Sequence, residues 1–179
     1  MAVTTVETQI PGLIEIHPRL WGDSRGFFLE TFQQEVYADI GIVTPFVQDN
    51  LSRSSHGVVR GLHFQVQNPQ GKLVTCLNGR VFDVVVDLRV DSGTYGQQYS
   101  TILDSERRNQ LWIPPGFAHG FSVLSEVADF FYKCTDYYDP DDEAGIRWND
   151  PDLNIDWQVK NPTVSLKDQC LPSLRGVLP

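Results

Sequence analysis

Residues 48–65 concentrate polar and ionisable side chains within a stretch that otherwise has the pattern of β-strands. Among them, Arg60 can bind an anionic group, and His63 can accept or release a proton near neutral pH. In a regular strand these two side chains point to opposite faces of the sheet, because their positions differ in parity. Gly61 lies between them and permits a bulge that redirects one of the two. The spacing therefore indicates a site beside a β-bulge.

The start of the same stretch carries a row of polar side chains. Gln48, Asn50 and Ser52 alternate along the sequence, so one face of a strand presents several hydrogen-bonding groups in succession. Such a face lines either solvent or a wet cavity, and the alternation alone does not distinguish between these two environments.

A second stretch, residues 111–121, places one histidine after a turn that prolines stiffen. The spacing Pro114-x-Gly116-x-x-His119 resembles the second motif of the cupin superfamily, which consists of small jelly-roll β-barrels. Metal-binding cupins have a His-x-His pair in their first motif, whereas this chain has Gln65 in place of the second histidine. Because a metal ion needs several convergent nitrogen and oxygen ligands, we expect no metal site.

Most of the remaining chain consists of short apolar stretches between turn residues, which predicts strands rather than helices. Only residues 31–41 have helical spacing, with Phe32, Val36 and Ile40 at intervals of four and Gly41 as the stop. Strands are predicted at residues 44–53, 58–66, 99–103, 110–113, 119–124 and 128–135. This pattern indicates an all-β sandwich or barrel that positions the two polar stretches.

Residues 72–88 have the clearest hairpin pattern, because Asn78-Gly79 supplies the positive φ angles of a tight two-residue turn. The second arm alternates between an apolar set and a set that includes charged residues: Phe82, Val84, Val86 and Leu88 against Asp83, Asp87 and Arg89. We therefore expect one face of this arm in the core and the other to carry charge.

The 179 residues have the composition of an ordinary soluble globular protein, with 41% hydrophobic and 21% charged residues. We expect one domain over residues 1–179. Fourteen lysines and arginines against 23 acidic residues give a net charge of −9. This charge argues against nucleic acid and anionic lipid as partners, but a few converging basic residues can still create a positive pocket for a small anion.

The sequence also contains no targeting or membrane signal that we recognise. Residues 1–7 lack a basic start and an apolar segment, and no apolar run approaches the length of a membrane span. The three cysteines form no CxxC pair and are odd in number, which indicates reduced thiols. We therefore expect a cytoplasmic protein that does not associate with membranes.

The ordered motifs together resemble one family, the dTDP-4-dehydrorhamnose 3,5-epimerases, over almost the whole chain. The segments that carry the resemblance are residues 23–30, 48–65, 70–74, 83–89, 112–121, 131–133, 148–151 and 166–168. The resemblance implies an all-β fold, a cupin-type jelly-roll β-barrel with few short helices. It also implies a homodimer that acts on a dTDP-sugar without a cofactor. Because exposed sheet edges invite pairing, the N-terminal segment is a candidate strand for donation to the second subunit.

The implied reaction inverts C3 and C5 of dTDP-4-dehydro-6-deoxy-D-glucose to give dTDP-4-dehydro-L-rhamnose. Epimerisation beside a ketone requires a base, a group that stabilises the enolate oxygen, and an acid that returns a proton to the opposite face. By resemblance, His63 is the base and Asp168 orients its ring and favours the imidazolium. The resemblance assigns the enolate oxygen to Lys72 and reprotonation to Tyr132.

The same resemblance implies a set of residues that hold the nucleotide diphosphate and the sugar: Arg25, Glu30, Gln48, Asp49, Asn50, Arg60, His119, Glu143 and Lys167. The planar fork of an arginine binds phosphate oxygens in pairs, so the basic members of this set suit a diphosphate. The substrate's own ketone accepts the electrons of the broken C–H bond, so the implied chemistry needs neither a metal nor a redox cofactor.

Several of these residues also have structural interpretations. Tyr132 lies in an aromatic run and can be a core residue, Lys72 can be a solvated loop charge, and Asp168 can be a solvated carboxylate. Asp83 and Asp87 have the spacing of an acid/base pair. We favour ion pairing for both. Asp83 is also a candidate to orient the ring of His63 without contacting the substrate itself.

Three other functions remain open from the sequence. The first is an epimerase that inverts only C3 or only C5 of another nucleotide sugar. The second is a metal-dependent cupin enzyme that uses His63 and His119 as partial ligands, against which the missing second histidine weighs. The third is a protein that binds a nucleotide sugar without turning it over.

Overall fold

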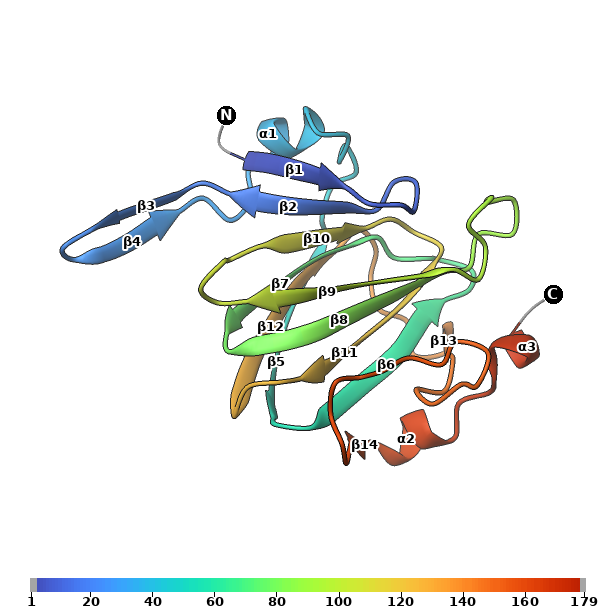
Figure 1. The fold of residues 1–179 in the computed structure, drawn as a ribbon. Coiled ribbons are helices and arrows are strands. Elements are labelled where there is room, and N and C mark those ends of the chain that lie inside the picture. Colours follow the sequence, from blue (N-terminus) through green and yellow to red (C-terminus); the bar gives the residue numbers. More distant parts are fainter. Residues whose placement is uncertain (1–2, 178–179) are drawn as a thin grey trace.

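The computed structural model describes residues 3–177, which form two packed and largely antiparallel sheets (Figure 1). The first sheet has the order β1 (Val3–Glu7), β2 (Ile14–Pro18), β10 (Gln110–Ile113), β7 (Lys72–Asn78), β12 (Val127–Cys134) and β5 (Gln48–Ser55). The second has the order β13 (Glu143–Gly145), β6 (Val58–Gln65), β11 (Phe117–Val123), β8 (Arg80–Asp87) and β9 (Gln98–Asp104), and β14 (Thr163–Val164) pairs in parallel with β6. From β5 to β8 and from β9 to β13, successive strands alternate between the sheets, which is a jelly-roll arrangement. The predicted all-β, cupin-type fold is confirmed.

The remaining elements are short. They are the hairpin of β3 (Leu20–Asp23) and β4 (Gly26–Leu29), and the helices α1 (Gln34–Ala38), α2 (Leu166–Gln169) and α3 (Leu174–Val177). The β3–β4 hairpin projects away from the two sheets as an arm (Figure 1). No helix within residues 3–177 is long and apolar enough to cross a membrane.

The predicted helix over residues 31–41 is present but shorter than expected. Gln33 caps α1, because its side-chain oxygen accepts a hydrogen bond from the backbone nitrogen of Val36 at 2.7 Å. Tyr37 is fully buried in α1 and packs with Leu73 and Trp112 of the first sheet. The helix therefore covers the outer face of that sheet, away from the second sheet.

The predicted hairpin over residues 72–88 is wrong, because its two arms belong to different sheets. β7 pairs with β10 and β12, whereas β8 pairs with β9 and β11. A type I′ turn needs positive φ at both central residues, but within Asn78-Gly79 only Gly79 has one, at +80°. A Cβ at Gly79 would come within 2.2 Å of the carbonyl oxygen of Val127. The Asn-Gly pair therefore serves a crossover between sheets.

β8 is also buried on both faces, which corrects the expected division into a core face and a charged face. Val85 packs in the core between the two sheets, and Val84 packs under the C-terminal segment on the other side. Asp83 and Asp87 are both 0% exposed. The strand pattern alone could not reveal this burial, because it depends on distant segments that cover both faces.

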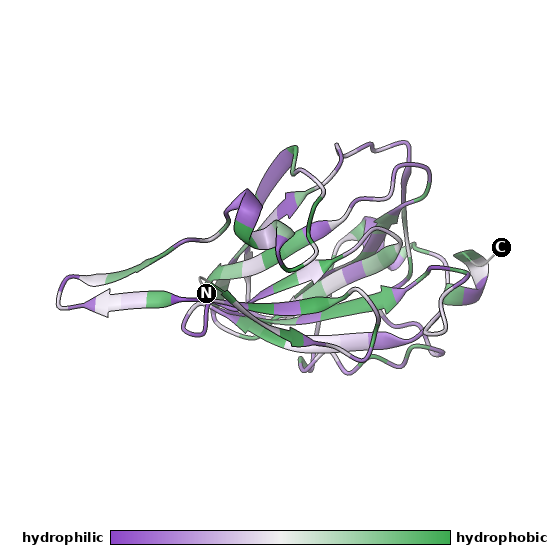
Figure 2. Ribbon diagram, turned by 90° about the horizontal axis from the view of Figure 1, so that it is seen from above, coloured by the Kyte–Doolittle hydropathy of each residue, from purple (hydrophilic) through white to green (hydrophobic). Residues whose placement is uncertain are grey.

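Among residues 3–177, three apolar clusters hold the sheets and the C-terminal segment together, and Figure 2 shows hydrophobic residues gathered along the strands. One lies between the sheets and includes Leu111, Phe121 and Phe130. The second joins the outer face of the second sheet to the C-terminal segment through Ile146 and Trp157. The third lies under α1. The two sheets and the C-terminal segment thus form a fixed frame for the side chains between them.

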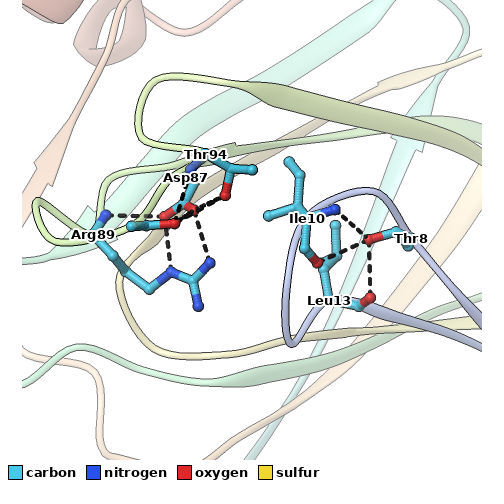
Figure 3. Close-up of polar contacts among 7 residues, drawn as sticks. Thr8, Ile10, Leu13, Asp87, Arg89 and Thr94 are labelled. Atoms are coloured by element: carbon cyan, nitrogen blue, oxygen red, sulfur yellow. Dashed lines mark hydrogen bonds and ion pairs between the residues drawn. The ribbon is translucent and has the colours of Figure 1, made fainter.

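Two loops are each fixed by one polar side chain (Figure 3). The Asp87 carboxylate accepts hydrogen bonds from the side chains of Arg89, Ser92 and Thr94, and from the backbone nitrogen of Arg89. The hydroxyl of Thr8 donates to the carbonyl oxygens at positions 10 and 13. The expected ion pair of Asp87 is therefore present, and it organises the loop after β8.

Candidate active site

A cavity of about 590 Å³ lies between the two sheets and is bordered by the segment that leads into α2. Ten of the residues predicted from the sequence line it: Gln48, Asn50, Arg60, His63, Lys72, His119, Tyr132, Glu143, Lys167 and Asp168. They come from both sheets and from α2. The polar face of β5 therefore lines a cavity, which resolves the alternative left open by its alternation.

The wall of the cavity contains a histidine–carboxylate pair. Nε2 of His63 on β6 lies 2.8 Å from Oδ1 of Asp168 on α2. The other carboxylate oxygen of Asp168 accepts a hydrogen bond from the backbone nitrogen of Gly61 at 3.2 Å. Asp168 is only 4% exposed. Burial acts to raise the pKa of Asp168, but the hydrogen bonds from His63 and Gly61 outweigh it and hold the pKa below its usual value.

A β-bulge brings Arg60 and His63 to the same cavity, as their spacing predicts. His63 pairs with His119 of β11, but Arg60 pairs with Phe121, so the register shifts between them. Gly61 has a φ of +112°, and a Cβ there would lie 2.6 Å from the Cα of Gly120. Only glycine fits this backbone.

Lys72 and Tyr132 lie on neighbouring strands of the first sheet, β7 and β12, and both line the cavity. Burial lowers the pKa of Lys72, although Cys134, Glu143 and Asp83 act in the opposite direction. Burial raises the pKa of the Tyr132 hydroxyl. Lys72 is thus not a solvated loop charge. The ring of Tyr132 packs against the core between the sheets, and Tyr132 also lines the cavity.

The rim of the cavity holds a second charged group around Glu143. Its carboxylate accepts hydrogen bonds from the hydroxyl of Tyr138 and from the ammonium of Lys167. Burial acts to raise the pKa of Glu143, but these two partners lower it below its usual value. The backbone nitrogen of Tyr138 donates to Gln48 at 2.9 Å. Tyr138 is therefore part of the cavity rim.

Gln65 replaces the second histidine of metal-binding cupins, and its side chain is engaged in the loop beside it. Its amide nitrogen donates to the carbonyl oxygens of Asn68 and Tyr137, at 2.8 and 3.3 Å. Its amide oxygen accepts from the backbone nitrogen of Asp139 at 2.9 Å. Gln65 thus stabilises the backbone of the neighbouring loops at the cavity rim.

Asp83 contacts a different histidine from the one considered in the sequence. Its Oδ2 lies 2.9 Å from Nε2 of His119, and no hydrogen bond joins it to His63 within residues 3–177. The cavity is therefore faced by two histidine–carboxylate pairs, one with Asp168 and one with Asp83. The sequence missed this second pair because β8 and β11 are brought together only by the fold.

Three predicted binding residues lie outside the cavity. Arg25 is at the tip of the β3–β4 arm and pairs with Asp23. Glu30 directly follows β4 and is exposed. Asp49 alternates with the cavity-facing residues of β5 and pairs with Lys133 on the other face of the sheet. Within a single chain, these three side chains do not join the ten predicted site residues that line the cavity.

Comparisons with known proteins agree with the resemblance in the sequence. The chain matches the family model of dTDP-4-dehydrorhamnose 3,5-epimerase over residues 7–176. It is 52% identical to a dTDP-4-dehydrorhamnose 3,5-epimerase of Pseudomonas aeruginosa over 162 residues, 89% of this chain and 90% of that protein. It is also 44% identical to a dTDP-4-dehydrorhamnose 3-epimerase of Streptomyces niveus, over 89% of this chain and 78% of that protein.

A solved structure is similar over nearly the same length. It is the crystal structure of the dTDP-6-deoxy-D-glucose-3,5-epimerase of Legionella pneumophila in complex with dTDP-4-keto-L-rhamnose. The TM-score is 0.95 at 51% sequence identity, and the match covers 98% of this chain and 94% of that one. The chain therefore belongs to the dTDP-4-dehydrorhamnose 3,5-epimerase family.

Proposed function

We propose that this chain inverts C3 and C5 of dTDP-4-dehydro-6-deoxy-D-glucose to give dTDP-4-dehydro-L-rhamnose, with His63 as the base. The observation that carries the proposal is the His63–Asp168 pair, which faces one cavity together with Lys72 and Tyr132. Membership of the 3,5-epimerase family supports the same reaction.

The first step is removal of the proton on the carbon beside the C4 ketone. His63 accepts this proton, and the carboxylate of Asp168 fixes the ring and stabilises the imidazolium that forms. The electron pair of the broken C–H bond moves into the ketone, so negative charge develops on the C4 oxygen. Lys72 supplies the positive charge that stabilises this oxygen.

The second step returns a proton to the opposite face of the same carbon. His63 lies on β6 of the second sheet, whereas Tyr132 lies on β12 of the first, so the two face the cavity from different walls. Tyr132 therefore serves as the acid. Its phenolate then takes a proton from solvent, and the imidazolium of His63 releases to solvent the proton that it removed. The same pair of groups acts at C3 and at C5.

The nucleotide diphosphate is held by the basic residues of the cavity. Arg60 and Lys167 line it and supply cationic donors for phosphate oxygens, although the whole chain has a net charge of −9. His119 lines the same cavity beside them. Gln48 and Asn50 offer hydrogen-bonding groups to the nucleotide. Glu143 holds Lys167 and Tyr138 at the rim.

The experiment that tests this function is incubation of the enzyme with dTDP-4-dehydro-6-deoxy-D-glucose in heavy water. Proton NMR of the sugar should show deuterium at both C3 and C5, because each inversion returns a solvent-derived proton. Deuterium at neither carbon would contradict the proposal and favour a protein that only binds the nucleotide sugar.

Inversion at a single carbon is the second candidate function. It is favoured by the Streptomyces niveus relative, which is a 3-epimerase and is 44% identical to this chain. The same NMR spectrum separates the two candidates, since a single-centre epimerase places deuterium at only one of the two carbons. The higher identity to the Pseudomonas aeruginosa 3,5-epimerase, at 52%, favours two inversions.

We further propose that the active form is a homodimer in which the β3–β4 arm packs against a second copy. The arm exposes four large apolar side chains: Leu20, Trp21, Phe27 and Phe28. Phe28 alone is 68% exposed, which is unusual for an arm in solvent and suits a covered surface. In such a dimer, Arg25 and Glu30 reach the cavity of the second copy. Sedimentation should give twice the 20.3 kDa chain mass, and a monomer would contradict the dimer.

We also propose that the chain works in the cytoplasm. The cysteines within residues 3–177, Cys76, Cys134 and Cys170, are free thiols, which suits a reducing compartment. In fractionated cells of the source, the enzyme should separate with a cytoplasmic marker. Recovery with the membrane or exported fraction would contradict this location.

A further inference from the structure

Asp83 is a fully buried carboxylate that the proposed mechanism does not use. It lies on β8, is 0% exposed, and accepts a hydrogen bond from Nε2 of His119 through Oδ2 at 2.9 Å. Its other oxygen, Oδ1, is buried and makes no hydrogen bond with any of residues 3–177. A buried carboxylate with an unpaired oxygen is destabilising, so its presence needs a reason other than stability.

Asp87 on the same strand provides the contrast. It is also 0% exposed, and its side chain has the same parity on β8 as that of Asp83. Its two oxygens accept five hydrogen bonds from Arg89, Ser92 and Thr94, so it stabilises the loop that follows β8. Stabilisation of this loop explains why Asp87 is a buried carboxylate. The single hydrogen bond of Asp83 is instead made with His119, which lines the cavity.

The residue that Asp83 holds is part of the cavity wall. His119 lines the cavity, and its ring stacks on Phe130 with centroids 5.9 Å apart and planes 23° from parallel. Because an ionised carboxylate can only accept, the contact with Asp83 assigns a proton to Nε2, and Nδ1 is the ring nitrogen without a protein partner among the described residues. The carboxylate and Phe130 together fix both the rotation and the tautomer of this ring.

The charge of Asp83 also acts on Lys72. Burial lowers the pKa of Lys72, and Asp83 is one of the groups that oppose this effect. The other groups that act on Lys72 in this way are Cys134 on β12 and Glu143 on β13, and the histidines that line the same cavity are His63 on β6 and His119 on β11. Lys72 must carry its proton to stabilise an enolate oxygen, so a buried negative charge nearby supports this role.

We propose that Asp83 is a positioning residue for the epimerisation, which fixes the ring of His119 in the cavity wall and contributes to the negative charge that favours the ammonium form of Lys72. The proposal rests on the proposed function, because it assigns Asp83 a task in the same cavity. It differs from the mechanism above in that Asp83 touches neither the sugar nor the diphosphate. It acts through His119 and Lys72.

The test compares Asp83→Asn with the matched control Asp87→Asn, since both remove one buried carboxylate from β8 at nearly constant volume. For Asp83→Asn, kcat/KM should fall about 10- to 100-fold, the size of loss seen when the hydrogen-bond partner of a metal-bound histidine is replaced. The alkaline limb of its pH–rate profile should move to lower pH, because Lys72 loses a neighbouring negative charge. For Asp87→Asn, the unfolding midpoint should fall, whereas kcat/KM of the folded enzyme and the alkaline limb should stay at wild-type values.

A third variant separates charge from orientation and remains informative if Asp83→Asn does not fold. Asp83→Glu keeps the negative charge but displaces the carboxylate by one methylene. It should keep the alkaline limb of the wild type and still lose kcat/KM, because the ring of His119 is no longer held in place.

The outcomes distinguish this inference from the function on which it rests. If the wild-type chain turns over and Asp83→Asn retains its kcat/KM and its alkaline limb, the inference is overturned and the function stands. Wild-type kcat/KM in Asp83→Glu would overturn the orienting role. A wild-type chain without turnover would contradict the function itself.

Discussion

The pairing of His63 with Asp168 joins parts of the chain that are 105 residues apart. Asp168 reaches His63 because α2 is anchored from its first turn: Ser165 caps the helix by accepting a hydrogen bond from the backbone nitrogen of Asp168 at 3.0 Å. Gly61 donates to the same carboxylate from the bulge in β6. The base of the proposed reaction is therefore oriented by the C-terminal segment, so a change in that segment acts directly on chemistry.

Asp168→Asn should lower kcat strongly while leaving the fold intact. The amide carries no charge to stabilise the imidazolium of His63 and can hold the wrong tautomer, which in comparable histidine–carboxylate pairs reduces kcat by about 10⁴-fold. Steady-state kinetics with the dTDP-sugar would measure the effect. Asp152→Asn is the matched control, because Asp152 pairs with Arg175 on the surface of the same C-terminal segment. Similar kcat values in the two variants would refute the role of Asp168.

Lys72 should set the alkaline limit of activity. Burial lowers its pKa from the usual 10.5, so the ammonium loses its proton at a lower pH than a solvated lysine does. The pKa of Tyr132 moves the other way, since burial raises it, so Tyr132 keeps its proton longer. As pH rises through the lowered pKa of Lys72, kcat/KM should therefore fall, with a midpoint below 10.5. A pH–rate profile that stays flat up to that value would contradict this assignment.

At the scale of elements, the bulge in β6 does the most to assemble the cavity. The register shift between β6 and β11 lets Arg60 and His63 face the same space, although a regular strand would separate them. It depends on close contact between Gly61 and Gly120, because a Cβ on either residue would meet backbone atoms of the other strand at 2.6 Å. The backbone of β6 thus sets the positions of Arg60 and His63 in the cavity.

Gly61→Ala should lower both stability and activity. Alanine disfavours the φ of +112°, and its Cβ would meet the neighbouring backbone, a strain of about 1–3 kcal/mol or more. Thermal unfolding and kcat/KM should both decrease. Gly93→Ala is a suitable control, since a Cβ there meets no atom within 4 Å. Wild-type kcat/KM in the Gly61→Ala enzyme would show that the bulge is not needed to place His63.

Some of these elements could be predicted from the sequence, and others could not. Strand 110–113 and the bulge at Gly61 could be predicted because they depend on local alternation and on one glycine. The hairpin over residues 72–88 could not, because the choice between a hairpin and a crossover depends on which distant strands pair with each arm. The burial of Asp83 is equally non-local, since the face of β8 that it shares with Val85 is covered by the opposite sheet.

At the scale of the whole molecule, the arm region contains two of the three predicted site residues that lie outside the cavity. Ten predicted site residues line the cavity, but Arg25 and Glu30 are on or next to the projecting arm. The arm exposes four large apolar side chains as well as the charged Asp23–Arg25 pair at its tip, and Figure 2 shows hydrophobic segments between hydrophilic ones along it. The resemblance names these two residues without saying from which subunit they come. The proposed dimer accounts for both observations, because it covers the arm and completes the cavity.

Two impaired variants should complement each other if the arm serves a second copy. Arg25→Ala removes the arm's cation, and His63→Asn removes the base, so each homodimer should have low activity. A mixed dimer has one site with both groups intact, so unfolding and refolding an equal mixture should restore about a quarter of the wild-type activity. If both groups served the same chain, no activity would return on mixing. The variants refolded separately are the controls.

The central claim is that His63 removes the proton at both carbons. Deuterium exchange at C3 and at C5, followed by NMR in heavy water for the wild type and for His63→Asn, tests it most directly. The account predicts exchange at both carbons in the wild type and at neither carbon in the variant. Exchange in His63→Asn at the wild-type rate, at either carbon, would contradict it and show that another group of the cavity is the base there.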